Sequence, residues 1–386
     1  MRPEAVNVLS LAASTGRINA QERVGIAGFR APGTNRASRN IAALDRLNAA
    51  TWSLFGEPAM KVLIADRFED RGIEELAHRG CQVFYEPGLD GDALHDAVAR
   101  TGCDALVVRS TRVTDEVLGA SPNLSLVIRA GSGYDTIDVD AATRRDVRVC
   151  NCPGMNSVAV AELTLGLMIA LDRRIVDETD DLRQGIWKKK EYGKARGLKG
   201  RTLGVVGLGR IGYEVAKRAK AFDMNLIYAD VIAHDNAECE LGVRRVTLDD
   251  VLTQSDFVTL HVPGGSDTKH LIGRKQLAMM KPTAFLLNCS RGGIVDEAAL
   301  AEALSAGAIA GAALDVYEVE PAATDTRFAD PIGNAPHLYG THHVGASTAQ
   351  AQTAVAEEAV RIIDHYMKSG ELLHCVNPRP PGVAAV

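Results

Sequence analysis

A glycine-rich turn between an apolar run and a helix constrains this chain more than any other sequence feature. Residues 203–206 (Leu-Gly-Val-Val) predict a buried strand, and the sequence continues directly as Gly-Leu-Gly-Arg-Ile-Gly. Gly207 allows a tight turn, Gly209 lets the backbone approach a pyrophosphate, and Gly212 lets a helix pack closely on a sheet. The N-terminus of that helix would offer unpaired N–H groups to phosphates. The turn therefore predicts a dinucleotide site.

An acidic residue after the next apolar run extends this prediction. Asp230 follows Gly212 by eighteen residues, at the end of the run 225–228. A carboxylate at this position can accept hydrogen bonds from a ribose diol and would repel a 2′-phosphate. The sequence therefore favours NAD over NADP as the cofactor.

Apolar runs alternate with helical stretches on both sides of the glycine turn. Strands are predicted at 61–65, 82–85, 105–108, 126–128 and 148–150, and again at 203–206, 225–228, 257–260, 284–287 and 309–314. Helices are predicted near 72–78, 92–100, 114–119, 139–145, 210–222 and 346–367, with one long helix over 158–183. This alternation predicts an α/β protein with two parallel sheets, each covered by helices.

The amino-acid composition excludes several classes of binding partner. The 386 residues carry a net charge of −6, which argues against nucleic acid or an anionic membrane surface as a partner. The most apolar stretch, 158–171, contains Glu162 and is too short for a membrane span. Seven cysteines without CxxC spacing indicate reduced thiols in a cytoplasmic protein, and no metal site is expected.

The N-terminal 59 residues differ from the rest of the chain. They hold seven Arg, no Lys and four acidic residues, so they are basic while the remainder is acidic. They lack the long apolar segment of a secretory signal. We expect residues 1–59 to be an unstructured extension that is not part of the fold.

Three downstream motifs identify a family resemblance. They are Asn-Cys-Ser-Arg-Gly-Gly-Ile-Val-Asp at 288–296, Leu-Asp-Val-Tyr-Glu-Val-Glu-Pro at 314–321, and Thr-His-His-Val-Gly-Ala-Ser-Thr at 341–348. With the glycine turn, they resemble the D-isomer-specific 2-hydroxyacid dehydrogenases over residues 60 to about 378. The resemblance implies a substrate domain (60–157 plus 346–386) with a Rossmann-like NAD domain (158–345) inserted into it. It also implies a homodimer formed through the NAD domain, for which the apolar helix beginning at Val158 is suited.

The resemblance also implies a catalytic set. Moving a hydride from a 2-hydroxy carbon requires a proton to leave the hydroxyl oxygen, which suits a histidine. A neighbouring carboxylate favours the imidazolium and fixes the ring tautomer, and an arginine can hold the substrate carboxylate. The family pattern assigns these roles to His343, Glu320 and Arg291. The family usually has proline before the catalytic histidine, where this chain has His342, but the following Val-Gly-Ala-Ser-Thr aligns His343.

Further contacts are carried over from the same family pattern. The implied cofactor contacts, beyond the three glycines and Asp230, are Arg210, Ile211, Val262, Thr268, Cys289, Ser290, Asp315 and Gly345. The implied substrate contacts are Arg109, Ser110, Ser132 and Gly133. Cys289 could be considered a nucleophile, but hydride transfer needs no covalent intermediate, so we interpret it as a small residue beside the cofactor.

The substrate prediction depends on a short motif. Asn156-Ser157-Val-Ala-Val-Ala-Glu162 resembles the phosphoglycerate dehydrogenase branch, whereas glyoxylate and hydroxypyruvate reductases tend to carry Thr-Asp there. The segment 109–114 is one residue shorter than the usual pattern, which leaves its phosphate contacts open. We predict oxidation of a small anionic hydroxy acid, D-3-phosphoglycerate, in L-serine synthesis. The alternatives are a glyoxylate or hydroxypyruvate reductase and a non-catalytic, NAD-sensing corepressor-like protein.

Overall fold

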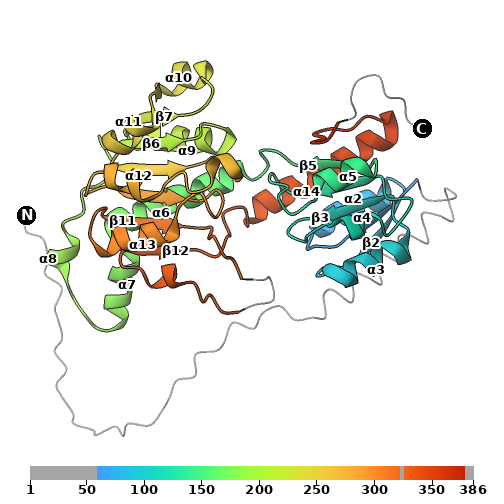
Figure 1. The fold of residues 1–386 in the computed structure, drawn as a ribbon, viewed down its shortest axis with the longest axis horizontal. Coiled ribbons are helices and arrows are strands. Elements are labelled where there is room, and N and C mark those ends of the chain that lie inside the picture. Colours follow the sequence, from blue (N-terminus) through green and yellow to red (C-terminus); the bar gives the residue numbers. More distant parts are fainter. Residues whose placement is uncertain (1–58, 322–325, 379–386) are drawn as a thin grey trace, which may run out of the picture. The chain divides into compact units, whose positions relative to one another are not determined.

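Two parallel sheets form the framework of the chain, as the alternating pattern predicted. The computed structural model describes residues 59–321 and 326–378. The proposed N-terminal extension lies outside the described residues except for Ala59, as do residues 379–386. Figure 1 shows each sheet with helices packed on its faces. The α/β class predicted from the sequence is therefore confirmed.

The first sheet has five parallel strands in the order β2-β1-β3-β4-β5, which is the flavodoxin-like order. Its strands are β1 (Met60–Ile64), β2 (Cys81–Tyr85), β3 (Ala105–Val108), β4 (Leu126–Arg129) and β5 (Arg148–Asn151). The intervening helices are α2 (Asp70–His78), α3 (Gly91–Thr101), α4 (Asp115–Leu118) and α5 (Val139–Arg144). All four residues of β3 are buried, as expected for a central strand covered on both faces.

The second sheet has seven strands in the order β12-β11-β10-β9-β6-β7-β8. Strands β7 and β8 extend the sheet on one side of β6, and strands β9 to β12 extend it on the other side. Its strands are β6 (Thr202–Val206), β7 (Asn225–Ala229), β8 (Arg244–Arg245), β9 (Phe257–Leu260), β10 (Phe285–Asn288), β11 (Gly311–Leu314) and β12 (Leu338–Gly340). Its helical elements are α6 (Ser157–Arg173), α7 (Ile175–Arg183), α8 (Lys189–Tyr192), α9 (Arg210–Ala221), α10 (Asp235–Leu241), α11 (Leu248–Gln254), η1 (Ser266–Thr268), α12 (Arg274–Met279), α13 (Glu297–Ser305) and η2 (Pro331–Asn334). The Rossmann-like order brings β6 and β9 side by side at the switch point where such folds bind dinucleotides.

The last helix packs against the first sheet. Helix α14 (Ala349–Ser369) begins at Thr348, whose side chain accepts a hydrogen bond from the Ala351 N–H. Its buried residues, such as Ala359 and Ile363, belong to the same apolar core as Val62 of β1 and Ile128 of β4. Chain segments from both ends of the described sequence therefore share one core.

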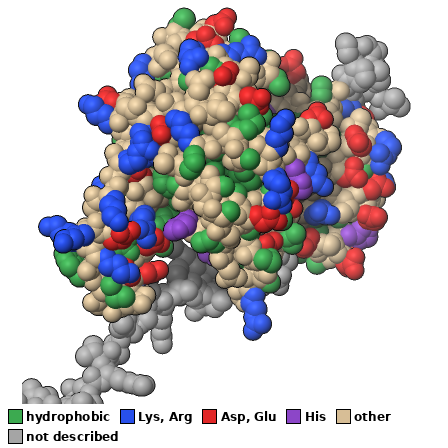
Figure 2. All heavy atoms as spheres, turned by 60° about the vertical axis from the view of Figure 1, so that its left-hand side comes forward, with side chains coloured by type: hydrophobic (Ala, Val, Ile, Leu, Met, Phe, Trp, Pro, Cys, Tyr) green, Lys and Arg blue, Asp and Glu red, His purple; other side chains and the backbone are tan. Residues whose placement is uncertain are grey.

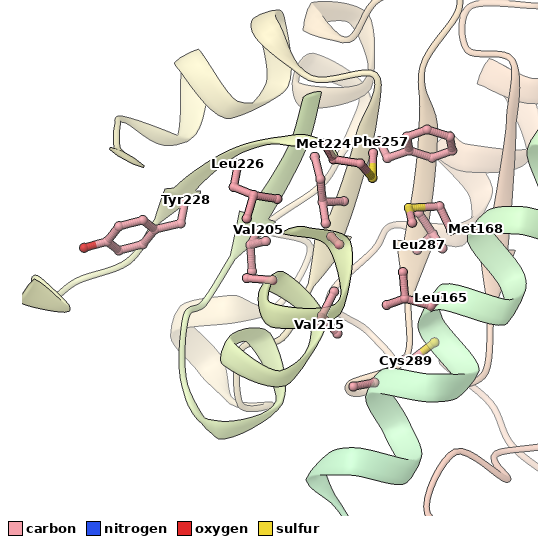
Figure 3. Packing of buried hydrophobic residues seen from close by; sticks show 14 of the residues in the cluster. Leu165, Met168, Val205, Val215, Met224, Leu226, Tyr228, Phe257, Leu287 and Cys289 are labelled. Atoms are coloured by element: carbon pink, nitrogen blue, oxygen red, sulfur yellow. The ribbon is translucent and has the colours of Figure 1, made fainter. Parts of the chain in front are cut away.

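Helix α6 packs into the core of the seven-stranded sheet. Figure 3 shows Leu165 and Met168 of α6 facing Leu287 of β10 and Cys289 just after it, with Phe257 of β9 nearby. This burial on several sides explains why the first half of the predicted long helix is apolar all round.

The prediction of one helix over residues 158–183 was wrong. The chain turns at Arg174, which has the left-handed backbone angles φ 54° and ψ 41°, and α7 begins immediately after it. The Arg174 guanidinium bonds to Asp177 at 2.9 Å and to Glu191 at 3.1 Å, which holds this turn in place. The two helices have different surroundings, because α6 is largely buried and α7 buries none of its residues.

Charged side chains of both signs are mixed on the surface. Figure 2 shows Lys and Arg side chains interspersed with Asp and Glu on the face that it displays. Within the described residues, the search for a helix long and apolar enough to cross a membrane finds none.

Candidate active site

The glycine turn lies between β6 and α9 at the switch point of the second sheet. Gly207 has φ +89°, and a β-carbon there would lie 2.6 Å from the carbonyl oxygen of His261. A β-carbon on Gly212 would lie 2.2 Å from the carbonyl oxygen of Gly207, so this glycine lets α9 pack onto the turn. A β-carbon on Gly209, by contrast, would meet no described atom within 4 Å. The turn is closely packed on one side and has space at Gly209 for a pyrophosphate, which fits NAD.

Asp230 lies beside this turn at the end of β7. Its Oδ2 accepts a hydrogen bond from the Leu208 N–H at 2.7 Å, and its Oδ1 accepts one from the Ile232 N–H at 3.2 Å. Burial raises the pKa of this carboxyl, but these two N–H groups and His234 outweigh burial and lower the pKa. Asp230 is therefore ionised and sits where it can accept hydrogen bonds from a ribose.

Two residues of the implied catalytic set form a hydrogen-bonded pair. His343 Nδ1 lies 2.7 Å from Glu320 Oε2, and the two residues follow the adjacent parallel strands β12 and β11. Burial raises the pKa of Glu320, but His343, the Tyr317 N–H and the charge of Arg291 together lower it. Because Nδ1 is bonded to the carboxylate, Nε2 is the ring nitrogen that remains for exchanging a proton with a substrate.

The neighbouring histidine has different surroundings. His342 is exposed and has no hydrogen bond or ion pair among the described residues. The contact with Glu320 therefore distinguishes the two histidines, which the sequence alone left to the alignment of the following five residues.

Asp315 anchors the loop that carries His343. Its buried carboxylate accepts hydrogen bonds from Thr341 Oγ1 at 2.6 Å and from the Val344 N–H at 2.9 Å. It also accepts one from the N–H of Gly345 at 2.9 Å, where a β-carbon would crowd the carboxylate. Asp315 and Gly345 thus fix the backbone on both sides of the histidine.

Arg291 contacts the loop after β4. Its Nε donates to Asp135 Oδ2 at 2.8 Å, and its Nη1 donates to the carbonyl oxygen of Ser290 at 2.7 Å. A β-carbon on Gly133 would lie 1.8 Å from Nη2 of Arg291, so the guanidinium lies against the bare backbone of that glycine. The structure therefore brings Arg291 together with the loop that carries two of the predicted substrate contacts, Ser132 and Gly133.

Polar contacts hold that loop in shape. Ser132 Oγ donates to Asn156 Oδ1 at 2.6 Å, and Asn151 Nδ2 donates to the carbonyl oxygen of Ser132 at 2.6 Å. The N–H of Gly154 donates to Ser132 Oγ at 3.3 Å. Asn156, from the motif used to predict the substrate branch, thus acts in this structure as a support for the loop.

Arg109 and Ser110 lie at the end of β3 on a loop that one carboxylate organises. Asp66 Oδ2 accepts hydrogen bonds from the N–H groups of Arg109, Ser110 and Thr111 at 2.6, 3.0 and 3.1 Å. Burial raises the pKa of Asp66, but these three donors outweigh it, so the pKa is lowered. Arg109 Nη2 in turn donates to Ser347 Oγ at 3.0 Å.

Arg129, at the end of β4, was not among the predicted site residues. Its Nε is buried and has no hydrogen-bond partner in the described part of the chain. A β-carbon on Gly131 would lie 1.6 Å from its Nη1, so the side chain folds over that glycine. Burial, followed by the charges of Arg291 and Arg109, lowers the pKa of Arg129 to about 10. Three arginines therefore lie close enough to affect one another, and among the described residues only Arg291 forms an ion pair with a carboxylate.

The remaining predicted cofactor residues border the glycine turn or β10. A β-carbon on Gly154 would lie 2.9 Å from Cδ of Arg210, Ile211 packs against the core, and Val262 Cγ1 lies beside Gly207. Thr268 Oγ1 donates to the carbonyl oxygen of Pro263 at 2.7 Å, within the loop after β9.

Cys289 and Ser290 follow β10. Ser290 Oγ donates to Asn288 Oδ1 at 2.7 Å, and Asn288 Nδ2 donates to the carbonyl oxygen of Arg291 at 2.9 Å, so the asparagine shapes the turn. Burial raises the pKa of Cys289 to about 12, which keeps the thiol neutral and argues against a nucleophilic role.

The sequence analysis also did not identify Glu297, a buried carboxyl that contacts the segment carrying Glu318 and Glu320. Glu297 Oε1 accepts a hydrogen bond from the Glu318 N–H at 2.7 Å, while Oε2 has no partner among the described residues. Burial raises the pKa of Glu297 to about 7.

The described residues contain no group of three or more side chains suited to hold a metal ion.

Known proteins share this arrangement of sequence and fold. Residues 165–345 match the family model described as D-isomer specific 2-hydroxyacid dehydrogenase, NAD binding domain. The chain is 43% identical over 311 residues to a D-3-phosphoglycerate dehydrogenase of Methanocaldococcus jannaschii, covering 79% of this chain and 57% of that protein. It is 42% identical over 326 residues to a glyoxylate reductase of Thermococcus litoralis, covering 81% of this chain and 95% of that protein. The crystal structure of the TT0316 protein from Thermus thermophilus has a TM-score of 0.74 and 34% identity, covering 82% of this chain and all of that one.

Proposed function

We propose, because the chain belongs to the D-isomer specific 2-hydroxyacid dehydrogenase family, that it oxidises D-3-phosphoglycerate to 3-phosphohydroxypyruvate with NAD. This reaction would supply the keto acid from which L-serine is made. The chain spans 57% of the length of the phosphoglycerate dehydrogenase named above, so its activity is inferred from the site and not from the whole of that relative.

The single observation that carries the substrate assignment is the group of three arginines. A 2-hydroxy acid has one carboxylate, for which Arg291 and the N–H groups of the 131–133 loop are sufficient. Arg129 is a further cation with a buried nitrogen that lacks a partner among the described residues, and Arg109 lies near it. A guanidinium with a buried, unpaired N–H is stabilised when an anion pairs with it. A phosphate on the substrate would supply that anion.

The residues of the site suit the chemistry of this reaction. NAD, when bound at the glycine turn, supplies the nicotinamide ring that accepts a hydride. Arg291 holds the substrate carboxylate and stabilises the developing carbonyl, while His343 Nε2 accepts the proton of the 2-hydroxyl group. Glu320 stabilises the resulting imidazolium through Nδ1, and Asp315 keeps the histidine loop in position.

The proposal divides the chain between two tasks. Residues 60–157 plus 346–386 would bind the substrate, and residues 158–345 would bind NAD. The core shared by α14 and the first sheet supports this division. Expression of residues 158–345 alone tests it, because the isolated piece should bind NADH and should show no turnover.

Turnover of a panel of keto acids tests the substrate. We expect kcat/KM with NADH to be highest for 3-phosphohydroxypyruvate among that compound, hydroxypyruvate, glyoxylate and pyruvate. Strong reduction of glyoxylate beside weak reduction of the phosphorylated acid would refute the assignment. It would favour instead a glyoxylate or hydroxypyruvate reductase, which the 42% identity to a glyoxylate reductase supports as the second candidate. If the pure protein binds NADH but reduces none of the four keto acids, this result would favour the non-catalytic, corepressor-like alternative.

Arg129 is expected to determine the preference for a phosphorylated substrate. Replacing it by methionine keeps much of the length of the side chain and removes the charge. We expect KM for 3-phosphohydroxypyruvate to rise by about 10- to 100-fold, the value of one hydrogen-bonded ion pair, while KM for hydroxypyruvate changes little. Steady-state kinetics on both substrates measure this difference. Arg144→Met, at the exposed end of α5, is the control, and an equal loss on both substrates would contradict the role.

Asp230 is expected to determine the choice between the two nicotinamide cofactors. Asp230→Asn keeps an oxygen for the Leu208 N–H but removes the negative charge beside the turn. We expect the ratio of kcat/KM for NADPH to that for NADH to rise by about ten-fold or more, because repulsion of the 2′-phosphate is lost. Asp235→Asn on α10 should leave the ratio unchanged. An unchanged ratio in the Asp230 variant would contradict this role.

We further propose that the protein is a homodimer joined through the NAD domain. The apolar residues of α6 pack into their own core, so they leave little surface for a partner. Several exposed apolar residues gather instead on α7 and the loop after it, where Leu182 is 57% exposed and Trp187 is 77% exposed. A second copy of the chain would cover them. Figure 1 shows α7 and α8 extending away from their sheet.

Sedimentation of a surface variant tests the dimer. We expect Leu182→Lys combined with Trp187→Glu to convert a dimer into a monomer at micromolar concentration, because it places charges in an apolar interface. Phe222→Lys, an exposed apolar position at the end of α9, is the control and should remain dimeric. A monomeric parent protein would contradict the proposal.

A cytoplasmic location is also proposed. All seven cysteines are free thiols in the structure, which suits a reducing compartment. Cell fractionation with detection of the native chain tests it, and recovery from a secreted fraction would contradict it.

A further inference from the structure

Two cysteines from distant parts of the sequence face each other at the edge of the first sheet. Cys150 of β5 and Cys375, which follows α14, form an antiparallel β-bridge. The Asn151 N–H donates to the His374 carbonyl at 3.3 Å, and the Val376 N–H donates to the Val149 carbonyl at 2.8 Å. The hydrogen bonds thus flank the two cysteines, and neither cysteine bonds directly to the other through its backbone.

This arrangement is the non-hydrogen-bonded type of antiparallel pair. In such pairs the two α-carbons are typically about 4.5 Å apart and the side chains approach more closely than in the other type. A disulfide requires an α-carbon separation of about 4.4–6.8 Å. The backbone of Cys150 and Cys375 therefore already has the spacing that a disulfide needs.

The segment that carries Cys375 is held firmly against β5. Asn377 Oδ1 accepts a hydrogen bond from the Val149 N–H at 2.8 Å, and its Nδ2 donates to the Val147 carbonyl at 2.9 Å. Arg148 Nη1 donates to the Asn377 carbonyl at 2.8 Å. These bonds hold the segment next to Cys375 in place, so the two cysteines already lie together in the folded chain.

The two thiols differ in accessibility and acidity. Cys150 is completely buried, whereas Cys375 is partly accessible. The hydrogen bond with the Cys150 thiol, then the Asn377 backbone and the charge of Arg148, lower the pKa of Cys375 although burial opposes this. The hydrogen bond with Cys375, together with burial, raises the pKa of Cys150. Cys375 is therefore the thiol that a reagent from solution reaches first, and Cys150 is the thiol behind it.

We propose that Cys150 and Cys375 are a dithiol site that a low-molecular-weight disulfide oxidises to a reversible intrachain disulfide. Cys375 loses its proton and attacks one sulfur of the reagent, which forms a mixed disulfide and releases the first small thiolate. The Cys150 thiol then loses its proton and attacks the Cys375 sulfur, which releases the second small thiolate. The two cysteines are oxidised, the reagent is reduced to two thiols, and the two protein protons are transferred to them.

The bond would join β5 covalently to the segment that follows α14. It closes a loop that contains the whole of the second sheet. A disulfide that closes a long loop restricts the unfolded chain strongly and so stabilises the folded state. The disulfide can be tested without knowing the substrate, because the tests count free thiols and measure the midpoint of unfolding.

Peptide mapping of the oxidised native protein tests the proposal. The full reduced chain is incubated with oxidised glutathione, quenched in acid, alkylated and digested without reduction. We expect a linked pair of peptides containing Cys150 and Cys375, a fall from seven free thiols to five, and full reversal by dithiothreitol. Cys375 carrying only glutathione, or both cysteines alkylated, would overturn it.

Variants identify the pair and test its fit. Cys150→Ala and Cys375→Ser should each abolish the link. Cys152→Ala should retain it, which excludes the cysteine that shares a peptide with Cys150, and Cys239→Ser, at the exposed cysteine of α10, should also retain it. The linked protein should unfold at a midpoint about 5 °C or more above the reduced form. A link that persists in Cys150→Ala, or a linked protein with an unchanged midpoint, would contradict a bond that fits the native structure.

Discussion

Replacing His343 by asparagine is expected to lower kcat by about 10²- to 10⁴-fold, the usual contribution of general acid–base catalysis. Asparagine can still accept or donate a hydrogen bond near Glu320, but it cannot take up the proton of the substrate hydroxyl. NADH binding should be nearly unchanged, because the glycine turn and Asp230 lie on other strands. Stopped-flow measurement of NADH oxidation, together with NADH titration by fluorescence, separates the two effects.

His342→Gln is the matched control for this prediction. It changes the adjacent histidine, which is exposed and lacks the contact with Glu320. We expect its kcat to stay within about three-fold of the parent value, as for surface substitutions away from a site. A larger loss in His342→Gln than in His343→Asn would reverse the assignment of the catalytic histidine.

Replacing Arg291 by glutamine is expected to lower kcat/KM by about 10²- to 10³-fold, comparable to the loss of one donor that stabilises developing negative charge. The guanidinium lies against Gly133 and is oriented by Asp135 and the Ser290 carbonyl, so its direction is fixed before a substrate arrives. Steady-state kinetics with the preferred keto acid measure the loss.

A second substitution distinguishes charge from geometry at this position. Arg291→Lys keeps the positive charge but cannot form two parallel hydrogen bonds to a carboxylate. We expect its kcat/KM to fall between that of the parent and that of Arg291→Gln. If both variants changed only the KM for NADH, Arg291 would be a cofactor contact and its proposed role with the substrate would be refuted.

The framework of the fold was predictable because its local signals agree with the tertiary structure. The apolar runs at 105–108 and 257–260 became β3 and β9 with the predicted bounds. The strand β8 has no such signal, because its two residues, Arg244 and Arg245, are both exposed and gain their strand geometry only from β7. The break at Arg174 was missed because its cause, contacts with Asp177 and Glu191, involves a residue seventeen positions away.

Residues of the site could be predicted from the sequence where they belong to a recognisable motif. The order of motifs named His343, Glu320 and Arg291, and the structure brings these three together, although their catalytic roles stay predictions. Arg129 was not among the predicted site residues, because its burial and the nearness of Arg109 and Arg291 come from segments distant in the sequence. Glu297 was missed for the same reason, since an acidic residue at the start of a helix is ordinary in sequence and unusual only when it is buried.

The core shared by α14 and the first sheet has a consequence for the order in which the chain can mature on the ribosome. The strands of that sheet are complete at Asn151, but their covering residues Val355 to Ile363 are synthesised about two hundred residues later. At typical translation rates this delay is about 10–40 s. The fully buried residues of the second sheet's cores all lie within residues 160–332, so that half can fold first. The first half of the nascent chain must therefore wait, with part of its apolar surface uncovered, for the last helix to emerge.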